Sequence, residues 1–380
     1  MPIAKSLPLV SSASESENQQ NGNVPGGWQL VTKRVAEDEL PTVSVIIPVR
    51  NEEEYIAQCL QSVVDQDYPK DLMEVLVVDG MSEDSSREIV SEIAGKFRFV
   101  TLLHNPKQVK AAALNKGIGE SSGQLILPVD AHSFIDPDYI SECVNALHQT
   151  DAANVGGVVL PIGTSFVQRA IGLGMSSFFG IGSVRFRDRE NGFYTDTVSF
   201  GAYRREVFEK IGLYDEEAHY GEDDELNFRL IKSGSKIFLS PRIKSRYYPR
   251  SSFSGLWKQY YNFGYGKVRT IRKHGRPASF RHLVPPFFVL SVVGSLLLFA
   301  IHPMFWWLTT AICGGYVMST IILSAKIGYE EGWKYLPALA VVFATLHFSY
   351  GIGLLNGLLN EISGFCLRQH CKDGKDVARK

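Results

Sequence analysis

The chain has 380 residues, 45% of them hydrophobic, and its 39 lysines and arginines nearly balance 40 acidic residues. A net charge of −1 gives no general attraction to a polyanion, so we expect no nucleic-acid partner. The five cysteines are scattered without a Cys-x-x-Cys pair, which argues against a disulfide framework and against a zinc site. A chain of this length usually holds one large domain or two ordinary domains of roughly 150 residues.

The first 39 residues are rich in Ser, Asn, Gln, Gly and Glu. Such a segment has too few apolar side chains to offset the entropy lost on folding, so residues 1–39 are predicted to be a disordered tail. The tail also lacks the apolar stretch of a secretory signal.

Short apolar runs then alternate with helical patterns as far as residue 250. The runs that read as buried strands are residues 42–49, 73–78, 97–103 and 124–129. Continuous apolar strands that alternate with helices are typical of a parallel sheet covered on both faces. The predicted class is therefore α/β.

Polar clusters follow three of these strands, at residues 50–52, 79–80 and 130–132. Because the carboxyl ends of parallel strands meet at one edge of a sheet, the three clusters are expected to line one ligand cleft. Each cluster taken singly also fits a helix cap, a turn or a solvated charge. Their convergence favours the cleft.

Asp130 and His132 lie two residues apart directly after the fourth run. Side chains two apart in an extended segment point the same way, so this pair is a candidate site for one divalent cation. Such a cation neutralises the leaving phosphates in diphosphate chemistry. The chain has neither a Gly-x-Gly-x-x-Gly nor a P-loop motif, so a nucleotide would be bound in another way.

Four consecutive acids, residues 222–225, open a predicted helix. One interpretation is surface charge matched to the helix dipole. The other is catalytic: crowded acids raise one another's pKa, and a carboxylate with a raised pKa is a better general base near neutral pH. These residues alone leave both interpretations open.

Several motifs in this order carry a resemblance to a known family. They are PTVSVIIPVRNEEEYIAQCLQSVVDQDYP, EVLVVDGMSEDSSREIV, NPKQVKAAALNKGI, LILPVDAHSFIDPDYI, FGAYRREVFEKIGLYDE and GEDDELNFRLIKSG. Over about residues 41–250 the chain resembles family 2 glycosyltransferases with the GT-A fold, whose sheet is mixed and mostly parallel. The C-terminal part is similar to succinoglycan-type exopolysaccharide membrane transferases. The resemblance implies an inverting enzyme that moves a sugar from a nucleotide-diphospho-sugar, a UDP-sugar, to a lipid-linked or polysaccharide acceptor.

The resemblance also implies roles for individual residues. The nucleotide-sugar would be held by Pro48, Arg50, Glu52, Asp79 and Asp130. The metal motif falls on Asp130 and His132, where the second carboxylate of the family is replaced by a histidine. Because imidazole tolerates Mn²⁺ better than Mg²⁺, the implied cofactor is a divalent metal, Mn²⁺ or Mg²⁺.

The catalytic motif of the family falls on the acidic run. Asp223 would be the base, with Glu222 and Asp224 as neighbours that position or tune it. A further motif, Gln-x-x-Arg-Trp, falls on residues 259–263 with Asn262 in place of the arginine. That motif is strongest in processive synthases, so its loss predicts a single sugar addition. Gln259 and Tyr260 remain candidates for contact with the acceptor, beside ordinary helix packing.

Three long apolar runs follow, at residues 284–301, 304–325 and 335–359, each near the ~20 residues that cross a bilayer. The predicted organisation is a catalytic domain at 40–250, an amphipathic or interfacial linker at 251–283, about three membrane segments within 284–360 and a basic tail at 361–380. An anchor suits a polyprenyl-diphosphate-linked sugar acceptor, which is confined to the membrane surface.

Basic residues before the first run place the catalytic domain in the cytoplasm by the positive-inside rule, as in a multi-pass protein of the inner (plasma) membrane. Three full crossings would put the basic tail on the opposite side, against the same rule. One run is therefore expected not to cross, and the sequence leaves open which one. Two other functions also stay open: a processive polysaccharide synthase, and an inactive scaffold subunit of a polysaccharide assembly complex.

Overall fold

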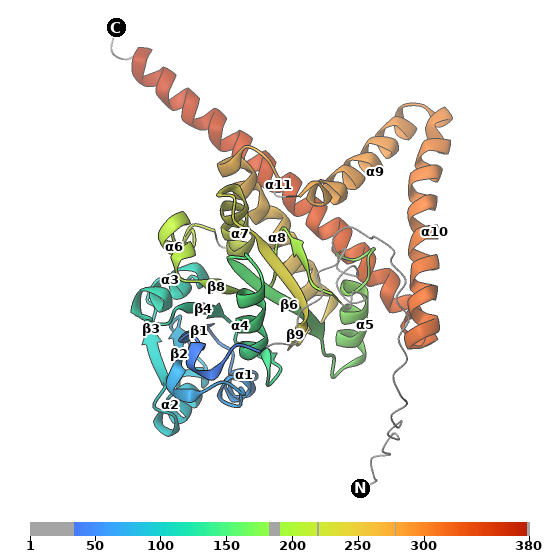
Figure 1. Ribbon diagram of the computed structural model, residues 1–380. Coiled ribbons are helices and arrows are strands. Elements are labelled where there is room, and N and C mark those ends of the chain that lie inside the picture. Colours follow the sequence, from blue (N-terminus) through green and yellow to red (C-terminus); the bar gives the residue numbers. More distant parts are fainter. Residues whose placement is uncertain (1–33, 182–190, 219, 278, 378–380) are drawn as a thin grey trace, which may run out of the picture.

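The computed structural model describes residues 34–181, 191–218, 220–277 and 279–377, with side chains up to residue 363. Most of the predicted disordered tail, up to residue 33, lies outside the described residues. Figure 1 shows a central sheet covered by helices. Three further long helices are formed by the C-terminal part of the chain.

Nine strands form one sheet in the described part of the chain. They are β1 (Val43–Val49), β2 (Met73–Asp79), β3 (Val100–His104), β4 (Leu125–Pro128), β5 (Ser133–Ile135), β6 (Asn154–Pro161), β7 (Phe193–Thr195), β8 (Ala202–Arg204) and β9 (Ile237–Tyr247). The predicted strands match β1, β2 and β4 within about two residues. The strand predicted at 97–103 begins later than expected. Phe97 still belongs to the end of the preceding helix, because its N–H donates a hydrogen bond to the Ile93 carbonyl.

The helices of the catalytic part are α1 (Ile56–Val64), α2 (Ser86–Lys96), α3 (Lys110–Glu120), α4 (Tyr139–Gln149), α5 (Phe166–Met175), α6 (Glu206–Ile211), α7 (Glu222–Lys232) and α8 (Phe253–His274). The C-terminal helices are α9 (Val284–Ile301), α10 (Trp306–Glu331) and α11 (Leu336–Val377). Short 3₁₀ segments are η1 (Glu37–Glu39), η2 (Lys70–Leu72), η4 (Phe280–Leu283), η5 (Pro303–Phe305) and η6 (Trp333–Tyr335).

The strand order is β3-β2-β1-β4-β8-β6-β9-β5, with β7 also paired to β9. Strands β1 to β4 are parallel, as the alternating pattern predicts, whereas β5, β7 and β8 pair antiparallel with their neighbours. Only four residues separate β4 from β5, too few for the crossover that a parallel neighbour requires. The sheet is therefore mixed.

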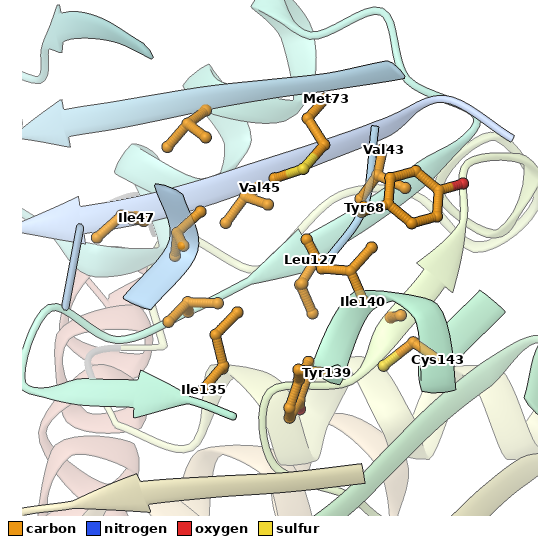
Figure 2. Packing of buried hydrophobic residues seen from close by; sticks show 14 of the residues in the cluster. Val43, Val45, Ile47, Tyr68, Met73, Leu127, Ile135, Tyr139, Ile140 and Cys143 are labelled. Carbon is orange, nitrogen blue, oxygen red and sulfur yellow. The ribbon is translucent and has the colours of Figure 1, made fainter. Parts of the chain in front are cut away.

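Both faces of the sheet are covered. Val45 and Ile47 of β1 pack in one hydrophobic cluster, and Ile46 between them packs in a second cluster. Figure 2 shows the first cluster, where Ile140 lies beside Leu127 on the side of the sheet to which Val45 and Ile47 point. Burial on both faces explains why β1 reads as a continuous apolar run.

Three described helical segments are long and apolar enough to cross a membrane: Phe280–Ile301, Pro303–Glu331 and Trp333–Ser363. This agrees with the three predicted runs. In Figure 1, α9 leads away from the middle of α11, and α10 returns to the start of α11.

Candidate active site

The loops after β1 and β2 are joined to each other at the carboxyl edge of the sheet. Asn51, with a φ of +54°, donates its backbone N–H to the Ser82 hydroxyl at 3.0 Å and accepts the Glu83 N–H on its side chain at 2.8 Å. The Glu52 N–H is held by the Ser86 hydroxyl at 2.8 Å. Two of the clusters predicted to converge, at residues 50–52 and 79–80, are therefore adjacent.

Asp79 is the last residue of β2 and is fully buried. Its Oδ1 accepts the Ser82 N–H at 3.1 Å, whereas its Oδ2 has no hydrogen-bond partner. Two basic side chains lie at longer range, with Arg87 Nε at 3.5 Å and the ring nitrogen Nδ1 of His104 at 3.9 Å from Oδ2. A buried polar atom without a partner costs about 1–3 kcal/mol. This oxygen is therefore suited to accept a hydrogen bond from a ligand.

Two further residues of the predicted nucleotide site lie nearby. Pro48 pairs with Val78 in the β1–β2 ladder and is partly buried. Arg50 is exposed, and its guanidinium donates to the Gln108 carbonyl at 3.4 Å. Arg50 thus lies between the strand ends and the loop before α3.

Lys110, the first residue of α3, joins two of the predicted site residues. Its Nζ lies 2.6 Å from Asp130 Oδ1 and 3.0 Å from Glu222 Oε1. Burial favours the neutral amine, but the carboxylates of Asp130, Glu222 and Asp223 raise the pKa of Lys110 well above its ordinary value. The ammonium therefore holds the β4–β5 loop and the start of α7 together.

Lys110 was missed by the sequence reasoning, although the sequence carries a signal for it. A lysine in the first turn of a helix opposes the helix dipole. Such a local misfit indicates a tertiary role.

His132 faces Glu52, with 3.2 Å between Nδ1 and Glu52 Oε1. Burial lowers the pKa of His132, but its hydrogen bond to Glu52 and the nearby Asp130 raise it above the ordinary value.

Within the described ranges, no group of three or more His, Cys, Asp and Glu is arranged to bind a metal. Asp130, 24% exposed, offers one hard oxygen ligand. The residues fit a cation that takes its other ligands from a diphosphate and water.

Three of the four acids that open α7 are paired with cations. Glu222 contacts Lys110, Asp224 contacts Lys267 of α8, and Glu225 contacts Arg229, Lys273 and His274. No ion pair among the described residues includes Asp223, whose Oδ1 accepts the Asp224 N–H at 2.8 Å. The four acids therefore have different environments.

Electrostatics separate Asp223 from Asp224 further. Burial, together with the charges of Asp224 and Glu222, raises the pKa of Asp223 to about 7. Burial acts in the same direction on Asp224, but Lys267 outweighs it and lowers the pKa of Asp224 below the ordinary value. The pKa values of the two neighbouring acids are therefore shifted in opposite directions, upward for Asp223 and downward for Asp224. Lys267 was also missed, because in the sequence it is one residue of a basic run before the membrane segments.

Gln259 and Tyr260 lie on α8. Tyr260 is 8% exposed and packs with Ile171, Met175 and Val342 in a cluster between α5, α8 and α11. No described hydrogen bond or ion pair joins Gln259 or Tyr260 to the four acids of α7. Asn262, at the place of the family arginine, donates to the Tyr220 hydroxyl at 3.0 Å.

The family model described as "Glycosyl transferase family 2" matches residues 44–212. Two curated proteins match most of the chain. The dolichyl N-acetyl-alpha-D-glucosaminyl phosphate 3-beta-D-2,3-diacetamido-2,3-dideoxy-beta-D-glucuronosyltransferase of Methanococcus voltae is 28% identical over 85% of this chain and 99% of its own. The succinoglycan biosynthesis protein ExoA of Rhizobium meliloti is 28% identical over 86% of this chain and 98% of its own.

A solved structure is similar in fold. The mannosyltransferase PcManGT from Pyrobaculum calidifontis, in complex with GDP-Man and Mn²⁺, superposes with a TM-score of 0.57. The match covers 84% of this chain and 88% of that chain at 18% sequence identity. This likeness confirms the predicted fold class.

Proposed function

Since this chain belongs to glycosyltransferase family 2 and is a glycosyltransferase, we propose that it adds one sugar, with inversion, to a lipid-linked acceptor at a membrane surface. The observation that carries the proposal is Asp223, which forms no ion pair among the described residues and whose pKa burial and the neighbouring acids raise to about 7. The names of the two relatives, one for a dolichyl-linked acceptor and one for succinoglycan biosynthesis, support a lipid-linked acceptor in cell-surface polysaccharide assembly.

In the proposed reaction the Asp223 carboxylate takes the proton from an acceptor hydroxyl. The acceptor oxygen forms a bond to the anomeric carbon of the donor from the face opposite the diphosphate. The bond between that carbon and the diphosphate oxygen breaks, and its electron pair leaves on the nucleoside diphosphate. Glu222 and Asp224, each paired with a lysine, hold α7 in place beside the base.

The proposed donor is a UDP-sugar bound at the carboxyl edge of the sheet. Asp79 Oδ2, with no hydrogen-bond partner, would accept from the base or ribose, and Pro48, Arg50 and Glu52 would line the same side. A divalent cation, Mn²⁺ or Mg²⁺, held by Asp130 with His132, would supply charge neutralisation of the departing diphosphate. The Mn²⁺ in the mannosyltransferase complex supports this assignment.

The proposed organisation follows the sequence expectation. A catalytic domain at 40–250 is joined by a linker at 251–283 to a membrane region at 284–360, with the catalytic domain on the cytoplasmic side of the inner membrane. Gln259, which is partly exposed on α8, would lie toward the acceptor, whereas Tyr260 packs between α5, α8 and α11.

The proposal is tested with membranes that contain the full chain and a panel of radiolabelled nucleotide-sugars. We expect one UDP-sugar to label a lipid-extractable product in a single addition, and the Asp223→Asn chain to form it roughly 10²–10⁴ times more slowly. A long labelled polymer would instead favour a processive synthase. No transfer from any donor, by a folded protein that binds UDP, would indicate a scaffold.

The metal assignment has its own test. Asp130→Ala should nearly abolish transfer with any divalent ion, whereas His132→Asp should keep activity and shift the preference from Mn²⁺ toward Mg²⁺. Transfer rates over a range of Mn²⁺ and Mg²⁺ concentrations measure both effects. Unchanged transfer by a folded Asp130→Ala protein would remove Asp130 from the site.

A further inference from the structure

The three apolar C-terminal segments differ in how much of their surface the protein covers. In the most apolar stretch of each segment, 17% of residues are buried in Phe280–Ile301 and 11% in Pro303–Glu331, but 56% are buried in Trp333–Ser363. Most residues in these stretches of the first two segments are therefore at least partly exposed. The third, which contains most of α11, does not.

The first half of that third segment is covered by α5 and the turn after it. The Tyr335 ring stacks on Phe166 at 5.1 Å, and a Cβ on Gly174 would lie 2.5 Å from Val342. His347 lies on the same side, with its Nε2 2.7 Å from the Phe179 carbonyl oxygen. All of these partners belong to the catalytic part of the chain.

The second half of the segment is covered by α8. A Cβ on Gly264 would lie 2.2 Å from the Tyr350 carbonyl, and a Cβ on Gly353 would lie 2.1 Å from the Tyr261 carbonyl, so the two backbones touch. Arg272 and Glu361 form an ion pair near the end of this contact. Helix α5 of the catalytic domain and helix α8 of the linker thus accompany α11 from Tyr335 to Glu361.

This packing limits how deeply α11 can enter the membrane. If α11 crossed the bilayer, α8 would have to lie beside it in the hydrocarbon. The cationic side chains on α8 are Lys258, Lys267, Arg269, Arg272 and Lys273. Because one charged residue at the bilayer centre costs about 2.5–3.5 kcal/mol, burying this helix at that depth is strongly unfavourable.

The α9–α10 hairpin has the features of a membrane-inserted pair. At 1.5 Å per residue its helices are about 27 Å and about 39 Å long, against a hydrocarbon core of about 30 Å. Exposed aromatic residues stand at both ends: Trp306 and Trp307 at the turn, and Phe280, Tyr329 and Trp333 at the opposite end. Tryptophan and tyrosine favour the two membrane interfaces.

Charge distinguishes the two ends of the hairpin. The turn between α9 and α10 contains no Asp, Glu, Lys or Arg, whereas Lys326 and Lys334 lie at the end next to the catalytic domain. By the positive-inside rule the turn is the end that is translocated.

We propose that only α9 and α10 cross the bilayer, as a hairpin, and that α11 stays on the catalytic side between the hairpin and the domain. Both ends of α11 then share one side of the membrane with the catalytic domain. This topology brings the basic segment 361–380 into agreement with the positive-inside rule. The inference rests on the proposed membrane attachment, and does not depend on the donor, the acceptor or the base.

The decisive test is the side of the C-terminus. The full chain with an epitope tag after Lys380 is produced in a bacterial host, and spheroplasts are treated with protease before and after lysis. We expect the tag to be protected in intact spheroplasts and digested after lysis. A matched chain with one additional apolar segment of about 20 residues before the tag should expose the tag in intact spheroplasts. Digestion of the parent tag in intact spheroplasts would overturn the proposal.

The hairpin is tested with a membrane-impermeant maleimide. His302→Cys, in the turn, should be labelled in intact spheroplasts above the level of the parent chain. Glu331→Cys, at the opposite end of α10, is the matched control and should be labelled only after lysis. A His302→Cys chain that is labelled only after lysis would show that the turn does not cross, and would overturn the proposal.

Failure of the proposed attachment is distinguishable from failure of this topology. Alkaline carbonate washing should leave the parent chain in the membrane fraction. Release of the whole chain would refute membrane attachment, and the topology with it. Retention of a chain whose tag is exposed would refute the topology alone.

Discussion

The carboxyl edge of the sheet and the contact between α8 and α11 are held together by different forces. At the edge, Lys110 joins the partly exposed Asp130 to the buried Glu222 through ion pairs. At the contact, the absence of side chains on Gly264 and Gly353 lets two backbones meet. The charges at the edge set the protonation of the site residues, whereas a well-packed contact resists added volume. Substitutions at the edge should therefore change the rate of transfer or the affinity for the donor. Substitutions at the contact should change the stability of the fold.

The largest effect is expected at Asp223. Asp223→Asn keeps size and hydrogen bonding but removes the basic carboxylate, so kcat should fall by roughly 10²–10⁴ with donor binding nearly unchanged. Asp224→Asn is the matched control and should lose much less, because Asp224 is paired with Lys267 and faces a different direction. Transfer rates at saturating donor decide between them. A dead Asp224→Asn with an active Asp223→Asn would move the base by one residue.

A smaller effect on donor binding is expected at Asp79. Asp79→Asn removes the charge of a buried acceptor, so UDP affinity should fall about 10- to 10²-fold, the range for a hydrogen bond to a charged group. Glu83→Gln, in the loop just after β2, removes a charge from an exposed acid and should leave UDP affinity unchanged. Calorimetric titration with UDP measures both. Equal affinities for Asp79→Asn and the parent chain would place the nucleotide elsewhere.

A substitution at the contact between α8 and α11 should instead lower the stability of the protein. Gly353→Ala puts a Cβ where the Tyr261 carbonyl lies, and overpacking of this kind costs about 1–3 kcal/mol, more than the gain from helix propensity. Gly294→Ala, on α9 with open space around it, is the control and should not lower the Tm. Thermal unfolding in detergent compares the two. Equal Tm values would mean that the close approach carries no stability.

The smallest effect is a shift in pH dependence. Asp223 must be ionised to accept a proton, so with a pKa of about 7 the value of kcat/KM should fall as the pH drops through about 7. Burial and the charge of Asp224 both raise this pKa, so Asp224→Asn should move the acidic limb to lower pH by up to about one unit. Profiles of kcat/KM against pH give the pH at the midpoint of the acidic limb. A midpoint that moves upward would contradict the assignment.

Much of the catalytic fold was predictable because its information is local. Strands β1, β2 and β4 are apolar on both faces, and each is followed by turn or helix-start residues, so their positions and their common edge could be inferred from the chain. Strands β5, β7 and β8 have three residues each, too few to show a periodic pattern. Their antiparallel pairing follows from short connections and from neighbours that are distant in the sequence.

The candidate site divides in the same way. Asp79 and Asp130 could be identified because strand ends bring them to one edge. The partners Lys110 and Lys267 could not, because an ion pair depends on which side chains meet across the fold. The difference between Asp223 and Asp224 also depends on those partners, since four adjacent acids look alike in the sequence.

The sequence by itself determined the family, the apolar strands, the acidic run and three apolar C-terminal helices, because composition and periodicity are properties of neighbouring residues. Only the tertiary structure decided which acid of α7 forms no ion pair among the described residues and which apolar helix is covered by α5 and α8. Mean hydropathy depends only on the side chains within one segment. The surroundings of that segment depend on packing between residues far apart in the chain.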